Sequence, residues 1–396
     1  MPMRRLSRGI TLINAQLSSG EITSLRIVGP RIADMGSVPR PGDSVVDLDG
    51  DRVLPGLINA HDHLQLNNLT LPGSHKIYRH VREWISDVDA RRRCDPEFEA
   101  GVAVARDERL LIGGVKNLLS GVTTVAHHDP LYPYLTDAHF PVRVVCNYGW
   151  AHSLYVDGEE RAGNSYRATP DDRPWIIHAA EGLDDEAGNE FERLDALHCL
   201  GPNTLLVHGI ALDRGQRRRL DRAGSGLIWC PSSNLRLFGR TAQVTELAAR
   251  GRVALGTDSR LSGARDLLDE LRLAGQLEFA DDESLESLVT ADSARLLRLA
   301  DRGVLRAGAR ADILILPRHA RLAATNRAQV RLVLIDGIVR YGDQDYARRV
   351  APRSAWRVVR VDGRTKILDS HIAERLSHAQ TSEVGLELSN ATWRAA

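Results

Sequence analysis

The chain has 396 residues, a formal net charge of zero and 26% charged residues. This length allows one large domain with a sizeable core and a smaller second domain. The balanced charge gives no electrostatic reason to expect binding to nucleic acid or to an anionic membrane, and the ordinary charged fraction argues against disorder.

The four cysteines, Cys94, Cys146, Cys199 and Cys230, include no C-x-x-C pair, and their spacing is not that of a disulfide framework. We therefore expect reduced thiols and a cytoplasmic location. The basic N-terminus is followed by no sustained apolar run, so we expect no signal peptide. No apolar stretch is long enough to span a bilayer, which argues against a membrane protein.

Residues 1–54 predict the first part of a small β-domain, because alternating runs such as "GITLINAQ" and "SVVDLDGDRVL" are punctuated by Gly, Pro and Asp. From Pro55 onward, strand-like apolar runs alternate with helical patterns. Repeated strand–loop–helix units favour parallel strands. Seven or eight such units predict a (β/α)8 TIM-type barrel of the α/β class over residues 55–304.

Residues 305–369 return to strand patterns in "ADILILP", "VRLVLIDGIVRYGD" and "WRVVRVDGRTKILD", and the last two contain Asp-Gly turn signals. We expect these strands to pair with the N-terminal ones, which gives a small β-sandwich built from both chain ends. Residues 370–396 form a weakly helical tail with no assigned role. Residues 142–177 are too short for two full units, so we expect either a reduced unit or a distorted barrel.

Polar side chains end several predicted barrel strands, at the end where barrel enzymes place their chemistry. The stretch "PGLINAHDHL" places His61 and His63 at i and i+2, so both point the same way from a strand. The runs "WIIH", "LLVH" and "LGTD" end in His178, His208 and Asp258. Each residue alone would have an ordinary structural explanation. Their common position predicts a metal site.

Imidazole and carboxylate ligands suit zinc or iron, and a catalytic site keeps one position for water. We expect one divalent metal, zinc with iron as the alternative, bound by His61, His63, His178 and Asp258. His208 would lie beside the bound water or the substrate.

The stretches "PGLINAHDHL", "HAAEG", "VHGIAL", "CPSSNLRL" and "GTDS", in this order, resemble the amidohydrolase superfamily. The closing "ADSARLLRLADRGVLRAGARADILIL" resembles that family's last barrel helix leading back into the β-domain. The resemblance covers residues 50–320 and implies a metal-dependent hydrolase with a (β/α)8 barrel and a flanking β-sandwich. A homodimer is a family-level expectation. Many members bridge two metals with a lysine near the fourth strand. None of Lys76, Lys116 and Lys366 is suitably placed, which favours a single metal.

Glu181 follows His178 by three residues in "HAAEG", which resembles the His-x-x-Glu of the mononuclear deaminase branch and of its triazine-hydrolase relatives. The resemblance implies that this glutamate shuttles protons. The chemistry requires such a group, because a ring nitrogen must be protonated as hydroxide adds and the amine must leave protonated. The ordinary alternative is a helix cap or a partner for an arginine.

Other polar and aromatic residues are candidates for substrate binding. Ser233 and Asn234 lie in the stretch that lines the pocket in the deaminase branch, although a hydrogen-bonded turn is an equal alternative. Gln65 lies on the same side as His63 if the strand continues. One of His127, His128 and Asp129 should face the pocket, and His152 is a further candidate. The candidates that we select for substrate binding are Gln65, Trp84, His128, Trp150, Ser233 and Asn234.

The first functional hypothesis is a hydrolytic deaminase that releases ammonia from a small amino-substituted heterocycle of the purine, pyrimidine, pterin or triazine type. Metal-activated water would attack the amino-bearing carbon, with Asp258 and His208 accepting its proton and Glu181 protonating the heterocycle. The alternative is hydrolysis of a cyclic amide, an imine or a C–Cl bond at the same metal. A third possibility is a non-catalytic scaffold that kept the barrel.

Overall fold

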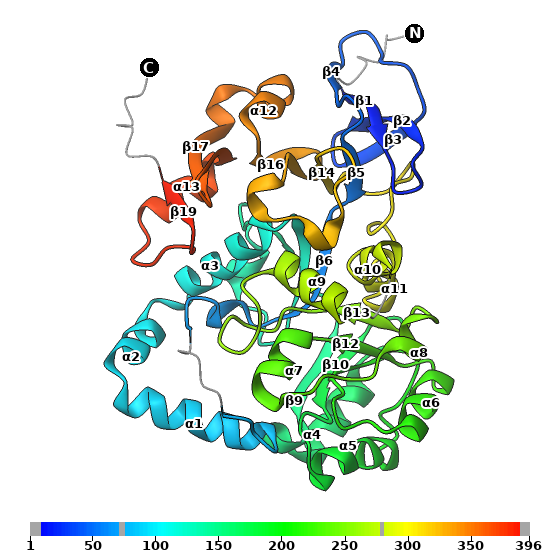
Figure 1. The fold of residues 1–396 in the computed structure, drawn as a ribbon, viewed down its shortest axis with the longest axis vertical. Coiled ribbons are helices and arrows are strands. Elements are labelled where there is room, and N and C mark those ends of the chain that lie inside the picture. Colours follow the sequence, from blue (N-terminus) through cyan, green and yellow to red (C-terminus); the bar gives the residue numbers. More distant parts are fainter. Residues whose placement is uncertain (1–8, 71–75, 278–280, 389–396) are drawn as a thin grey trace.

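The computed structural model describes residues 9–70, 76–277 and 281–388. Helices and strands both contribute to it, so the fold belongs to the mixed α/β class (Figure 1). Strands come first along the chain, strands and helices then alternate, and strands return towards the C-terminal end. No described helix combines the length and the apolar character needed to cross a membrane.

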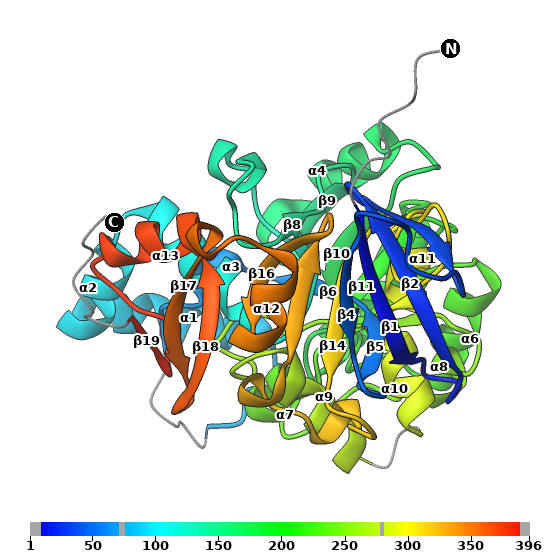
Figure 2. The ribbon, with the colours of Figure 1, turned by 90° about the horizontal axis from the view of Figure 1, so that it is seen from above.

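Eleven strands from the two ends of the chain form one sheet, in the order β19-β17-β18-β16-β15-β14-β5-β1-β2-β3, with β4 pairing to β1 (Figure 2). The N-terminal strands are β1 (Ile10–Gln16), β2 (Ile22–Val28), β3 (Arg31–Met35), β4 (Ser44–Asp47) and β5 (Arg52–Pro55). The C-terminal strands are β14 (Ile313–Leu316), β15 (Leu332–Ile335), β16 (Ile338–Gly342), β17 (Trp356–Val361), β18 (Arg364–Asp369) and β19 (Leu386–Leu388).

The antiparallel pair β5 and β14 joins the two chain ends and is buried on both faces. Leu54 lies opposite Leu314, and Val53 lies opposite Ile315. Because successive strand residues point to opposite faces, Leu54 and Leu314 pack into the large cluster that includes β6 and β7. Val53 and Ile315 pack on the other face, among the strands of the eleven-stranded sheet. This junction attaches the sheet to the part of the chain that carries the histidines.

Eight parallel strands between residues 57 and 255 lie in two further sheets. The three-stranded sheet contains β6 (Leu57–Asp62), β7 (Val122–His127) and β8 (Arg143–Val144). The five-stranded sheet contains β9 (Gly149–Ser153), β10 (Trp175–Ala179), β11 (Thr204–His208), β12 (Gly226–Trp229) and β13 (Val253–Leu255). Strand ladders do not join these two sheets within the described residues, so the sheets by themselves do not show a closed barrel.

The region 142–177 contains both of the strands that a regular repeat needs. The two-residue β8 and the strand β9 are separated only by residues 145–148, without a helix, and α4 then leads to β10. The expected irregularity is therefore a reduced unit that lacks one helix.

The helices begin where the sequence supplies caps. The side chains of Asp184, Asp213 and Asp266 accept hydrogen bonds from backbone N–H groups in the first turns of α5, α6 and α9. The helices up to β14 are α1 (Val81–Cys94), α2 (Pro96–Ala103), α3 (Arg106–Leu119), α4 (Leu154–Ala168), α5 (Asp185–Ala196), α6 (Arg214–Arg222), α7 (Pro231–Phe238), α8 (Thr245–Ala248), α9 (Leu267–Gln276), α10 (Asp282–Leu288) and α11 (Ala291–Leu296). Two more, α12 (Gln344–Val350) and α13 (Ser370–Ser377), follow.

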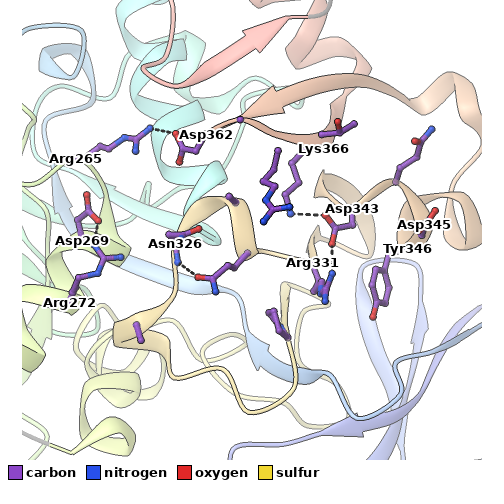
Figure 3. A pocket seen from close by; sticks show the side chains of 18 residues that line it. Arg265, Asp269, Arg272, Asn326, Arg331, Asp343, Asp345, Tyr346, Asp362 and Lys366 are labelled. Atoms are coloured by element: carbon purple, nitrogen blue, oxygen red, sulfur yellow. Dashed lines mark hydrogen bonds and ion pairs between the residues drawn. The ribbon is translucent and has the colours of Figure 1, made fainter.

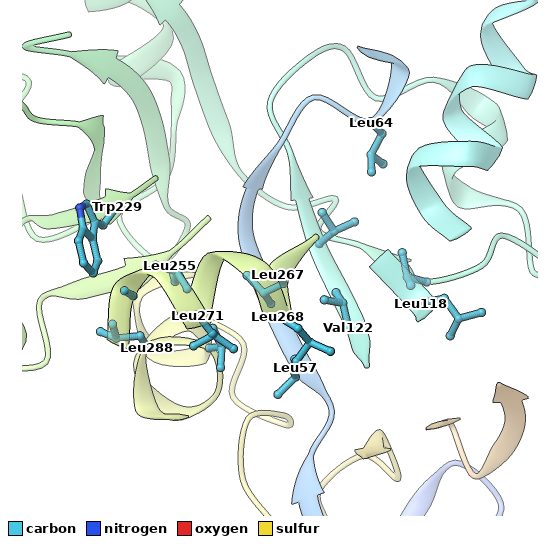
Figure 4. Close-up of a cluster of buried hydrophobic side chains, with 14 of the residues drawn as sticks. Leu57, Leu64, Leu118, Val122, Trp229, Leu255, Leu267, Leu268, Leu271 and Leu288 are labelled. Atoms are coloured by element: carbon cyan, nitrogen blue, oxygen red, sulfur yellow. The ribbon is translucent and has the colours of Figure 1, made fainter. Parts of the chain in front are cut away.

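Leucines of α9 pack against strands β6 and β13. Figure 4 shows Leu267, Leu268 and Leu271 between Leu57 of β6 and Leu255 of β13. All five side chains are at most 1% exposed. Burial of a leucine side chain contributes about 1.5 to 3 kcal/mol. These leucines therefore join α9, β6 and β13 in one core cluster.

The C-terminal tail is more ordered than its sequence suggests. After α13, residues 378–385 lead to β19, which pairs antiparallel with β17 at one edge of the large sheet. The last residues of the tail, 389–396, lie outside the described residues.

Candidate metal centre

The predicted ligands come together at the carboxyl ends of β6 and β10 and in the loop after β13. The Nε2 atom of His178 lies 3.3 Å from Nε2 of His61 and 3.4 Å from Nε2 of His63. The Oδ1 atom of Asp258 lies 3.8 Å from Nε2 of His61 and 3.7 Å from Nε2 of His63. All four residues are buried, at most 7% exposed.

These distances fit a tetrahedral metal. Zinc–nitrogen bonds of about 2.0 to 2.1 Å at tetrahedral angles place neighbouring ligand atoms about 3.3 to 3.4 Å apart. The imidazole nitrogens already have this spacing, and the carboxylate oxygen is slightly farther away. The chemistry and the spacing of the donor set therefore both suit a zinc ion.

Hydrogen bonds at the far side of the rings orient two of the imidazoles. Nδ1 of His178 lies 2.7 Å from the carbonyl oxygen of His152, and a carbonyl can only accept, so Nδ1 carries the proton. Nδ1 of His63 lies 2.6 Å from the Asp129 carboxylate. These contacts direct both Nε2 atoms towards the common point, as outer-shell partners do in metal sites.

Asp129 also affects the charge of His63. Burial lowers the pKa of His63, but the Asp129 carboxylate outweighs this effect and raises the pKa to about 9. A metal bound at Nε2 would displace the proton that this shift favours, because metal ligands must be deprotonated.

Asp258 is held as an anion. Its Oδ2 accepts hydrogen bonds from the hydroxyls of Ser233 at 2.8 Å and Ser262 at 2.6 Å, and its Oδ1 accepts one from the backbone N–H of Ser259. Burial raises the pKa of Asp258, but His63, His208 and these hydrogen bonds outweigh it and lower the pKa. Asp258 can therefore serve as a ligand or a base.

The loop after β13 also touches β6 directly. The backbone N–H groups of Thr257 and Asp258 donate to the carbonyl oxygen of His61 at 3.0 and 3.1 Å. Asp258 has a φ of +53°, an uncommon backbone conformation for a residue other than glycine. The two hydrogen bonds help to fix this conformation and bring the carboxylate to the histidines.

Glu181 and His208 form a second pair beside these ligands. Their Oε1 and Nε2 atoms are 3.5 Å apart. Burial, Asp258 and Glu190 raise the pKa of Glu181 well above its ordinary value, and burial lowers the pKa of His208. Nδ1 of His208 donates to the side-chain oxygen of Asn234 at 2.9 Å, which leaves Nε2 as an acceptor. Near neutral pH, the pair is therefore a protonated carboxyl beside a neutral imidazole.

A strained turn places Glu181 at this position. Ala180 has a φ of +55°, which is uncommon for alanine. Its N–H donates to Glu190 of α5 at 2.7 Å, and its carbonyl accepts from Ala211 at 3.0 Å. Burial raises the pKa of Glu190 to about 7. Glu190 holds the turn between His178 and Glu181 and was not identified in the sequence.

His128, which directly follows β7, lies closer to the cluster of His61, His63 and His178 than the sequence predicts. The His128 ring stacks on the His178 ring with centroids 4.4 Å apart. Its Nε2 donates to the carbonyl oxygen of Ala151 at 3.0 Å, and its Nδ1 has no hydrogen-bond partner among the described residues. The ligand atoms of His61, His63, His128 and His178 all lie within 4.8 Å of one another, so His128 is a further candidate ligand.

The other predicted substrate residues lie around the same centre in different ways. Ser233 and Asn234 are fully buried and bound to Asp258 and His208. The Gln65 amide donates to Asp129 at 2.7 Å. The Trp150 ring lies 5.5 Å from the His128 ring, while Trp84 packs against two small apolar clusters. Their role in substrate binding stays a prediction.

A buried polar layer on the opposite side of β6 was also not identified. Nζ of Lys116 lies 3.2 Å from the Asp62 carboxylate, 2.7 Å from Oδ1 of Asn67 and 3.1 Å from the hydroxyl of Thr257. Asp62 lies between His61 and His63 in the sequence. Strand alternation in the sequence indicates that Asp62 faces away from the two histidines. Its partner Lys116 lies in α3, so the local pattern does not reveal the contact.

Comparison with known proteins agrees with this geometry. Residues 169–339 match the Amidohydrolase family. The chain is 28% identical to 8-oxoguanine deaminase from Pseudomonas aeruginosa, over 83% of this chain and 87% of that protein. The part of the chain over residues 169–339 is therefore similar to the amidohydrolase family.

Two solved structures share the fold. A zinc-bound adenosine deaminase from Xanthomonas campestris has a TM-score of 0.69 and 18% identity, covering 87% of this chain and 96% of that one. The atrazine chlorohydrolase from Arthrobacter aurescens, complexed with zinc, has a TM-score of 0.67 and 18% identity, covering 83% and 94%.

Proposed function

We propose that this protein is a zinc-dependent aminohydrolase that deaminates a small amino-substituted heterocycle. The observation that carries the proposal is the convergence of three imidazole nitrogens and one carboxylate oxygen on one point, with the carboxyl of Glu181 beside His208 next to them. The similarity to an 8-oxoguanine deaminase and to an adenosine deaminase supports a purine-type substrate.

His61, His63, His178 and Asp258 would hold one zinc ion, with iron as the alternative metal. When bound, such a metal lowers the pKa of a water molecule towards about 7. His128 could complete the ligand set or contact the substrate, because its Nδ1 is free of hydrogen bonds within the described residues.

Three side chains of this protein would move the protons. Asp258, held as an anion, accepts a proton from the attacking water, and His208 can share it. Glu181, held protonated, gives its proton to the ring nitrogen next to the amino-bearing carbon. As the C–N bond breaks, the leaving amino group takes the proton that Asp258 accepted from water, and the new hydroxyl group returns a proton to Glu181. Water and the amine substrate thus become the oxo product and ammonia.

Gln65, Trp84 and Trp150 would bind the heterocycle. The Gln65 amide nitrogen is engaged with Asp129, and its Oε1 has no partner in the described part of the chain. It would therefore accept a hydrogen bond from a ring N–H. Ser233 and Asn234 would orient Asp258 and His208 rather than contact the substrate directly.

We further propose that the eight parallel strands β6 to β13 form a (β/α)8 barrel over residues 55–304. The support is that they follow one another in chain order and that the ends of β13 and β6 are hydrogen-bonded at His61. Residues 1–54 and 305–369 would form the β-sandwich. A cytoplasmic location and a homodimer remain predictions from the sequence.

Hydrolysis of a C–Cl bond is the second candidate, because the fold is also that of an atrazine chlorohydrolase. Screening the zinc-loaded protein against aminopurines, aminopyrimidines, aminopterins and chlorotriazines separates the two candidates. We expect ammonia release from at least one aminated heterocycle. Chloride release without ammonia from any compound would contradict the deaminase assignment.

A further inference from the structure

Glu383 lies between α13 and β19, far along the chain from the metal centre, and is 1% exposed. Its two carboxylate oxygens accept hydrogen bonds from the guanidinium of Arg260 at 2.6 and 2.9 Å. Arg327 donates to the same carboxylate at 2.6 Å. One buried carboxylate therefore serves two buried guanidinium groups.

Arg260 connects this carboxylate to both metal-binding loops. It follows Asp258 by two residues, and its backbone N–H donates to Oδ1 of Asn67 at 3.0 Å. Its guanidinium also donates to the carbonyl oxygen of Asn67 at 3.3 Å. The Asn67 amide donates in turn to Asp62, between His61 and His63, at 2.8 Å. The loop after β13 is thereby tied to the loop after β6.

The segment that carries Glu383 is itself fixed at several points. The backbone N–H of Thr381 donates to Glu108 of α3 at 2.6 Å. Gly385 accepts from the backbone N–H of Asp362 at 2.8 Å, and Val384 accepts from Arg327 at 2.6 Å. The segment can therefore hold Glu383 at a defined place against Arg260.

We infer that Glu383 is a positioning residue for Asp258, acting through Arg260, so that the C-terminal segment is part of the scaffold of the metal centre. The inference rests on the proposed function, in which Asp258 is a ligand. Without the Glu383 carboxylate, Arg260 would be a buried and unpaired charge, which is strongly unfavourable, whereas Arg327 would keep Asp362 and Asp266 as partners. Arg260 would then move towards other acceptors or water and take the Asp258 loop with it.

Glu383→Gln tests this link, because glutamine keeps the shape but removes the charge. Cobalt(II) is the probe, since its visible absorption reports the ligand geometry. We expect an altered spectrum and at least about a tenfold weaker retention of the metal against a chelator, the size of effect seen when outer-shell partners of a metal site are changed. The matched control is Glu387→Gln, four residues further on, whose side chain is 68% exposed and pairs with Arg360.

Each result decides between the two proposals. If Glu383→Gln binds cobalt with the same spectrum and the same retention as the wild type, the inference is overturned and the metal site stands. A wild-type protein that binds no cobalt would overturn the proposed function and this inference together. Arg260→Lys carries the same test if Glu383→Gln does not fold, because lysine keeps the buried charge but not the two-point contact.

Discussion

Two polar regions of the molecule differ in how their charges are arranged. The groove between the start of α9 and the strands β16 to β18 is large, with a volume of about 1520 Å³, and is lined by many charged side chains (Figure 3). Several of its charges are paired: Arg331 and Lys366 both bind Asp343, and Arg272 binds Asp269.

At the candidate metal centre, by contrast, the ligand atoms converge on one point. Nε2 of His178 lies 3.3 and 3.4 Å from the Nε2 atoms of His61 and His63, and Oδ1 of Asp258 lies 3.7 to 3.8 Å from the same two atoms. The pKa of Glu181 is raised and that of His208 is lowered, and shifted pKa values are typical of functional sites. The comparison teaches that convergence of ligand atoms on one point, and not the size of a cavity, separates a reactive polar region from a structural one.

The largest expected effect comes from removing a ligand. In His178→Ala, the three-imidazole set loses the nitrogen that lies 3.3 and 3.4 Å from the other two, so we expect loss of bound zinc and of detectable turnover. Elemental analysis of the purified variant and an ammonia assay check this. Full zinc content with undisturbed turnover would contradict the assigned metal centre.

Glu181→Gln should leave the metal in place but lower kcat by about 10² to 10⁴-fold, the contribution expected from a general acid. Glutamine has a similar shape but cannot give up a proton. Zinc content and kcat measured on the same preparation separate this role from metal binding. Near-full activity would remove Glu181 from the mechanism.

Glu190→Gln tests whether the raised pKa of this buried carboxyl makes the stability of the protein depend on pH. The pKa of Glu190 is raised to about 7, so the folded protein holds this proton while the unfolded chain has lost it above about pH 4.5. Stability contributed by the proton is therefore present at low pH and is lost as pH rises through 7. The shift corresponds to about 3 to 4 kcal/mol.

We therefore expect the free energy of unfolding of the wild type to fall between pH 5 and pH 8 more steeply than that of Glu190→Gln. Chemical denaturation at several pH values measures this difference. Parallel pH dependences of the two proteins would show that Glu190 keeps an ordinary pKa.

The smallest effect is expected in the groove. Asp269→Asn breaks the ion pair with Arg272, in which each side chain is about one-third exposed. Exposed ion pairs contribute about 0 to 1 kcal/mol, so we expect a stability change within that range and unchanged turnover. Thermal unfolding and the ammonia assay test both statements, and a large loss of turnover would give the groove a function that its pairing does not indicate.

Much of the candidate site was predictable because its signals are local. His61 and His63 share a face by strand alternation, and His178, His208 and Asp258 each follow an apolar run. The pairing of β5 with β14 also follows the predicted return to strands. The position of His128 against the metal histidines was not readable, since His127 and Asp129 had equal claims to face the site.

Partners from distant segments could not be predicted. Nothing in the local pattern links Glu190 to the strained turn at Ala180, or Lys116 to Asp62. The tail was weakly periodic in sequence, yet it supplies a strand and the buried Glu383.

By itself, the sequence determined the class of fold and the chemical types of the metal ligands, because strand and helix periodicity and the residues at strand ends are local properties. Tertiary structure decided which imidazole nitrogen points inward, which carboxyl keeps its proton and what holds each loop. These properties depend on burial and on contacts such as Arg260 with Glu383, 123 residues apart. Desolvation and hydrogen bonding act only once the chain has brought such groups together.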